Sequence, residues 1–197
     1  NVGNTIYSSL QTVIDDATAG DTIDTKGAFD EDIAVGAQLA FNFDDTTVDS
    51  FALSAAAPGS TLNGDLTATG AITLNGASTV DGGLTAASFT SNAALTMVGD
   101  LDVSGAAALN GAASITGDVT ADSLTTGSTL ALKGDLVAAN GVTLGGASTI
   151  TGNVKSGNFT SDGTLALVGG LTSTGDALFN GATTVNGGTL VFGNNAV

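Results

Sequence analysis

A segment of 35 residues recurs along the last two thirds of the chain. Its copies begin at Gly64, Gly99, Gly134 and Gly169 without insertion or deletion, and the shorter fourth copy runs to the end of the sequence. Self-similarity at a fixed period of this length is typical of proteins in which equivalent units stack along one axis. The repeat therefore predicts a solenoid.

Within each repeat, shorter segments such as AITLNG and ASTVDG contain one or two apolar residues and usually end in Gly, Asn, Asp or Ser. Two apolar residues separated by one polar residue lie on the same face of a strand, and the small residues are suited to corners. Three such segments make about 17 or 18 residues, half of one repeat. We therefore expect an all-β, single-chain parallel β-helix with about three short strands in each coil.

Apolar residues recur at equivalent positions of the copies and are expected to form interior columns. These columns contain Leu66, Leu101, Leu136 and Leu171; Leu74, Leu109, Leu144 and Phe179; Val80, Ile115, Ile150 and Val185; and Phe89, Leu124 and Phe159. Asn75, Asn110 and Asn180 each precede a glycine. We expect these asparagines to occupy corners with a left-handed backbone, which Asn tolerates better than most residues.

An N-terminal helix is expected over residues 7–17, after an extended lead at residues 1–6. Ser8 or Ser9 is suited to the N-cap position. An apolar stripe with helical spacing is formed by Leu10, Val13, Ile14 and Ala17. A solenoid needs such an element to cover the open interior of its first coil, so we interpret this helix as an end cap.

The chain is expected to form one continuous domain with two parts. Residues 1–63 contain the cap helix and irregular first coils, and residues 64–197 contain the regular array. Three phenylalanines within a short span predict wider early coils or an extra packed layer: Phe41, Phe43 and Phe51. Pro58-Gly59 marks a turn at the junction of the two parts.

The first 35 residues resemble the leading segment of right-handed parallel β-helix proteins of the pectate-lyase-like and adhesin type. The matching residues are Leu10, Ile14, Ala17, Gly20, Asp21, Thr22, Ile23, Gly27, Phe29, Glu31 and Ile33. The resemblance implies the fold and a secreted surface protein, but it does not imply an activity, because the same leading segment occurs in lyases, adhesins and inert surface proteins. The repeat array also resembles the tracts of bacteriophage tail fibres.

The composition argues against several classes of function. The formal net charge is −16, with three Lys, no Arg, no His and no Cys. Phosphate recognition needs cationic side chains, so we do not expect a nucleic-acid partner. Imidazole catalysis, thiol chemistry and the usual zinc sites are excluded. No apolar run is long enough to span a membrane. The first residue is Asn rather than Met, which predicts that a preceding segment is removed on secretion.

Carboxylates are the remaining site candidates. The densest group is in the N-terminal third and contains Asp21, Asp24, Asp30, Glu31 and Asp32. A calcium site there is the alternative to solvated carboxylates, although no EF-hand spacing occurs. Asp65, Asp100 and Asp135 recur at the repeat period, so we place them two coils, about 10 Å, apart and interpret them as a solvated corner. No catalytic residue and no bound cofactor other than calcium is expected.

Two functional hypotheses follow. The first is a non-enzymatic, extracellular structural protein that assembles head to tail into a surface filament, sheath or adhesin stalk, because the fourth repeat ends without a cap helix. The second is a receptor- or carbohydrate-binding module, such as a tail-fibre segment or an adhesin. A chain that is part of a longer solenoid is the alternative explanation for the uncapped end.

Overall fold

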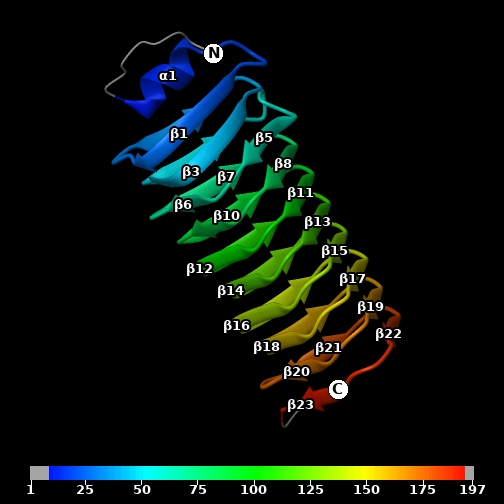
Figure 1. Ribbon diagram of the computed structural model, residues 1–197. Helices are drawn as coiled ribbons and strands as arrows, with labels where there is room; N and C mark the ends of the chain where they lie inside the picture. The colour runs from blue at the N-terminus through cyan, green and yellow to red at the C-terminus, as the bar shows by residue number, and fades with distance from the viewer. Residues whose placement is uncertain (1–8, 194–197) are drawn as a thin grey trace.

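The computed structural model describes residues 9–193, which form a parallel β-solenoid of about 10 coils of roughly 18 residues each. The coils stack along one axis, so the two ends of the chain lie at opposite ends of an elongated molecule (Figure 1). The all-β solenoid predicted from the repeat is therefore confirmed. Each coil has three faces, which we name A, B and C in the order in which the chain passes through them.

Most strands lie on a single face. Face A contains β5 (Ser60–Asn63), β8 (Ser78–Asp81), β11 (Leu95–Val98), β13 (Ala113–Thr116), β15 (Leu130–Leu132), β17 (Ser148–Ile150), β19 (Leu165–Leu167) and β22 (Thr183–Val185). Face B contains β6 (Leu66–Ala68), β9 (Leu84–Ala86), β20 (Leu171–Ser173) and β23 (Leu190–Phe192). Face C contains β2 (Asp32–Val35), β4 (Ser50–Leu53), β7 (Ala71–Leu74), β10 (Ser88–Ser91) and β21 (Ala177–Phe179).

Other strands bend around a corner and belong to two faces. Those that run from face A to face B are β1 (Thr22–Ala28) and β3 (Ala40–Val48). Those that run from face B to face C are β12 (Leu101–Leu109), β14 (Val119–Thr126), β16 (Leu136–Leu144) and β18 (Val154–Ser161). All of these strands pair in parallel with their equivalents in the adjacent coils.

The corner between faces B and C explains why the sequence period is two coils. Hydrogen bonds between equivalent corner residues span 18 and 17 residues in alternation. The pairing of β12 with β14 shifts register between Val103 and Ala106, where two residues of β12 lie opposite one residue of β14. The same shift occurs in β16, between Ala138 and Gly141. The longer coil thus has one extra residue at this corner, and two unequal coils make one repeat of 35 residues.

The predicted interior columns are confirmed. Side chains alternate between buried and exposed along most of the strands, as expected for a pleated strand with one face on the core. The fully buried members of the four predicted columns are Leu66, Leu101, Leu136 and Leu171; Leu74, Leu109 and Leu144; Val80, Ile115 and Ile150; and Phe89, Leu124 and Phe159. Phe179 and Val185, in the last coil, are only partly buried but pack against the core.

The N-terminal helix is shorter than predicted. The helix α1 spans Leu10–Asp16, with Ser9 as its N-cap, and Leu10 and Ile14 are its buried residues. The predicted extended lead at residues 1–6 lies outside the described residues.

The early coils are wider than those of the regular array, as predicted. The strands β3 and β5 are offset by 21 residues, as the hydrogen bond between Asn42 and Asn63 shows. The rings of Phe41, Phe43 and Phe51 pack together, with centroids 5.5–6.1 Å apart. These large side chains fill the wider cross-section at this end of the solenoid.

One backbone prediction was wrong. Among the described non-glycine residues, only Asp45 has a positive φ, so Asn75, Asn110 and Asn180 do not have a left-handed backbone. Their side chains form ladders between coils instead. The Nδ2 atom of Asn92 donates to Oδ1 of Asn75 and that of Asn110 donates to Oδ1 of Asn92, both at 2.7 Å. An amide both donates and accepts, so stacking satisfies it without a special backbone conformation.

Candidate functional site

The two ends of the solenoid differ in how their strand edges are covered. At the N-terminal end, α1 lies against β2 and shields the edge of face C (Figure 1). The side chain of Gln11 pairs with the backbone of Ala34 in β2: the Ala34 N–H donates to Oε1 at 2.7 Å, and Nε2 donates to the Ala34 carbonyl at 2.9 Å. This amide takes the place of a neighbouring strand, which blunts an edge that would otherwise be free to pair.

Glu31 fixes the helix over this edge. Its carboxylate accepts hydrogen bonds from the Ser9 hydroxyl at 2.9 Å and from the N–H groups of Gln11 at 3.0 Å and Leu10 at 3.3 Å. A helix start has free N–H donors, and a carboxylate there is favoured. These bonds, chiefly the one from Gln11, hold the pKa of Glu31 below its usual value. Glu31 is the only Glu of the chain and has a structural role in the cap.

Replacing Glu31 with Gln is expected to weaken the attachment of α1 by about 1 kcal/mol. Because the pKa of Glu31 is lowered in the folded state, its stabilising contribution is complete above the unfolded-state pKa of about 4.3. That contribution is lost as the pH falls through the lower folded-state pKa. Amide protection factors of α1 at neutral and acidic pH should therefore fall in the wild type and change less in the variant.

Asp16→Asn is the matched control, because it removes a carboxylate from the same helix away from its N-terminus. We expect this variant to keep the pH dependence of the wild type. An unchanged pH dependence in Glu31→Gln would contradict the assigned role of Glu31.

The other predicted calcium ligands each have a partner of their own. The carboxylate of Asp21 accepts the N–H of Thr18 at 2.8 Å and its hydroxyl at 3.0 Å, and these bonds lower the pKa of Asp21. Asp24 accepts a hydrogen bond of 2.6 Å from Nδ2 of Asn42 in the next coil. Both carboxylates therefore stabilise local structure at the N-terminal end.

Asp30 and Asp32 lie near a third carboxylate, Asp49. Partial desolvation and the negative charges of Asp30 and Asp32 raise the pKa of Asp49. Asp32 also accepts a 2.6 Å hydrogen bond from the Ser50 hydroxyl. Within residues 9–193, no three carboxylates are arranged so that they could hold a metal ion. The predicted calcium site has not been tested by a measurement of binding and stays a prediction.

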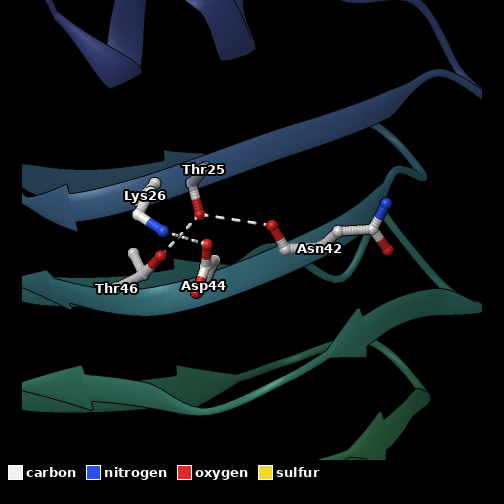
Figure 2. A network of polar contacts seen from close by, with 5 residues as sticks. All are labelled: Thr25, Lys26, Asn42, Asp44 and Thr46. Carbon is white, nitrogen blue, oxygen red and sulfur yellow. Dashed lines mark hydrogen bonds and ion pairs between the residues drawn. The ribbon is translucent and has the colours of Figure 1, made fainter.

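A polar network joins the first two coils between β1 and β3 (Figure 2). The hydroxyls of Thr25 and Thr46 are 2.7 Å apart and buried, and Oγ1 of Thr25 donates to the Asn42 carbonyl at 3.5 Å. Lys26 forms an ion pair of 2.6 Å with Asp44 on the outer surface. Both charged side chains are largely exposed, so the ion pair contributes little stability. One of the three lysines is thus engaged in a structural contact rather than in a reactive one.

The recurring aspartates form a ladder along the corner between faces A and B. Asp118 lies between Asp100 and Asp135, so these carboxylates occupy three successive coils rather than alternate coils. Each Oδ1 atom accepts the backbone N–H of the equivalent residue in the next coil, at 2.8 Å for Asp100 and 2.7 Å for Asp118 and Asp135. Asn153 continues the ladder. The side chains are exposed, which agrees with the predicted solvated corner.

Two grooves run along the sides of the solenoid. The groove on face A has a volume of about 690 Å³ and is lined by small uncharged residues, among them Ala94, Thr96 and Ala112. The groove on face B has a volume of about 670 Å³ and includes Asp65 and Asp100. Neither lining contains a basic or aromatic side chain, so neither groove has the groups that acid–base catalysis on a sugar or stacking on a ring would use.

The C-terminal end has no cover within the described residues. The outer edges of β21, β22 and β23 have no strand partner there, and β23 pairs only with β20. Leu190 and Val191 are 44% and 48% exposed. Phe192 and Phe179 are partly buried, with ring centroids 6.0 Å apart. This end combines free backbone groups with apolar surface.

The same end carries no charge. Residues 177–193 contain no Asp, Glu, Lys or Arg, although the chain has a net charge of −16. The sequence had indicated an uncapped last repeat, but the exposure of its side chains could only be seen once the coil was placed.

Among the described residues, no helix has the length and hydropathy needed to cross a membrane. Comparison of the chain with models of protein families, with curated proteins and with solved structures found no significant match.

Proposed function

We propose that this chain is a non-enzymatic, secreted structural protein whose copies assemble head to tail into a surface filament, sheath or adhesin stalk. The observation that carries the proposal is the uncovered C-terminal coil, in which three free strand edges border the apolar side chains of Leu190, Val191 and Phe192. Natural proteins usually blunt such edges, because an open edge pairs with any strand that reaches it. A second copy is a cover that the chain itself can supply.

The distribution of charge favours contact through the ends rather than the sides. Exposed aspartates follow the corner between faces A and B along much of the array, including Asp65, Asp100, Asp118 and Asp135. Two solenoids lying side by side would bring these like charges together, which opposes association. The uncharged coil at residues 177–193 has no such cost.

The placement of the aromatic residues favours a structural role over recognition. A binding module usually presents aromatic side chains at the centre of its contact surface. None of the eight phenylalanines is exposed here: Phe41, Phe43, Phe51, Phe89 and Phe159 are buried, and Phe29, Phe179 and Phe192 are partly buried. The side surfaces instead present mainly Thr, Ser, Ala, Asn and Asp.

Replacing Leu190 with Asp is expected to weaken assembly by on the order of 100-fold, because an unpaired carboxylate would be buried at the contact between copies. The variant should remain folded, since Leu190 is 44% exposed in the single chain. Sedimentation velocity over a range of protein concentrations, with negative-stain microscopy of the same samples, measures this effect.

Val98→Asp is the matched control, because Val98 is 52% exposed in the middle of the solenoid and lies far from both ends. This variant should assemble like the wild type. If the wild-type chain remains monomeric at every concentration, the proposed function is wrong.

A further inference from the structure

We infer that the outer edge of β1 is the surface that receives the C-terminal coil of the next copy, so that β22 and β23 of one copy pair in parallel with β1 of another. This inference rests on the proposed function and identifies the partner of its C-terminal coil. β1 is the first strand of the array and bends from face A to face B, so one strand can receive both β22 and β23.

The columns of face A match across the proposed contact. Ile23 begins the interior column of this face, which continues through Phe41 and Leu62, and Val185 ends it. Outside the core, Thr22 begins the adjacent column and Thr184 lies in β22 next to Val185. Stacking β22 on β1 in the register used throughout the array would therefore place an apolar side chain on Val185.

The columns of face B match in size. Leu190 pairs with Leu171 at the end of an interior column, and Gly27 pairs with Thr46 at its beginning. A Cβ atom added to Gly27 would have no neighbour within 4 Å, so this end of the column has free space. A protruding leucine and a vacant glycine position are complementary in shape. Next to them, Phe192 would approach Phe29, which is also only partly buried.

Face C does not take part in this strand pairing. Its N-terminal edge is covered by α1 and by the Gln11 side chain. A helix is about 10 Å across, whereas adjacent coils are about 4.8 Å apart. The strands of faces A and B can therefore pair between copies only if the next copy is tilted away from face C. A repeated tilt at a contact between different surfaces does not close on itself, and it produces a helical fibre.

Charge and shape favour this pairing over the other two end contacts. Two N-terminal ends would bring Asp24, Asp30 and Asp32 of both copies together and would repel. Two C-terminal ends are uncharged, but they would oppose Leu190 to Phe192 or Leu190 with no vacant position between them. Only the contact between unlike ends joins an uncharged coil to the free space at Gly27.

Cysteine cross-linking tests the inference, because the chain contains no native Cys. Thr22 and Thr184 are exposed. In the proposed register they lie on adjacent strands, about 5 Å apart, within the range that a disulfide spans. Under mild oxidation of preformed assemblies, the double variant Thr22→Cys/Thr184→Cys should give a ladder of covalent dimers, trimers and longer multimers. We expect at least about tenfold more product than in a control pair, since juxtaposed thiols have a high effective concentration.

The control pair is Thr22→Cys/Thr96→Cys, in which Thr96 is an exposed residue of β11 in the middle of the solenoid. Dimers from Thr184→Cys alone would show contact between two C-terminal ends and would overturn the inference. Assemblies that form without cross-links in the double variant would overturn it as well, while leaving the proposed function intact. Absence of any assembly in the uncrosslinked wild type would instead contradict the proposed function itself.

Discussion

Replacing Leu109 with Asp is expected to lower the free energy of unfolding by more than about 4 kcal/mol and to unfold the array cooperatively. Leu109 is 1% exposed in the interior column that contains Leu74 and Leu144. A carboxylate at this position would have neither water nor a cationic partner, since the nearest layers of the column contribute Ser91 and Thr126. Thermal denaturation followed by circular dichroism measures the loss.

Thr125→Asp is the control for this variant. Thr125 lies in the adjacent coil of face C but points outward and is exposed. The same charge there is expected to change stability by less than about 0.5 kcal/mol. Equal melting temperatures for Leu109→Asp and Thr125→Asp would mean that the assigned register of face C is wrong.

Replacing Gly99 with Ala is expected to cost about 3 kcal/mol. Gly99 has a φ of 139°, a conformation that residues with a side chain rarely adopt. Its Cα also lies against the Gly82 carbonyl of the preceding coil, so an added methyl group would come closer than 3.0 Å to backbone atoms. Neither coil can move away without breaking the parallel ladder between them. Urea denaturation of the variant measures the effect.

Gly36→Ala provides the comparison for the glycine. A Cβ at Gly36 would meet nothing within 4 Å, and its φ lies outside the left-handed region. This variant should be neutral or slightly stabilised, because Ala reduces the conformational entropy of the unfolded chain. A large loss of stability in Gly36→Ala, or none in Gly99→Ala, would contradict the close packing of the glycine corner.

The sequence allowed the core to be predicted because the fold is repetitive. Each interior column is sampled several times, so positions such as Leu101 and Ile115 could be recognised from their equivalents without knowledge of any long-range contact. The burial of these residues depends on the pleat of short strands, which the alternation of apolar and polar residues defines directly. The same reasoning located the cap helix to within a few residues.

The corners were predicted less well, because corner chemistry depends on the register between coils. The two coils of one repeat are not equivalent in sequence, so Asp118 was not recognised as the coil between Asp100 and Asp135. The preference of Asn for a left-handed backbone at Asn75 is outweighed by the hydrogen bond that its amide forms with Asn92. A local preference is overridden when stacking offers every coil the same partner.

The ends of the molecule were the least predictable part. The role of Glu31 depends on its approach to Ser9 and Gln11 across 20 or more residues of sequence. No short motif records that contact. The exposure of Leu190 likewise depends on what is stacked on its coil, which its own sequence does not reveal.

The alternation of 17- and 18-residue coils separates the length of the molecule from the chemistry of its ends. Each coil is bonded only to the coils before and after it, and the corner between faces B and C regains its original register after every 35 residues. Duplication or loss of one whole repeat would therefore lengthen or shorten the solenoid by about 10 Å and leave every interior contact of the remaining coils in place. Copy number sets the distance between the two terminal surfaces, while the residues of the first and last coils alone decide what binds there.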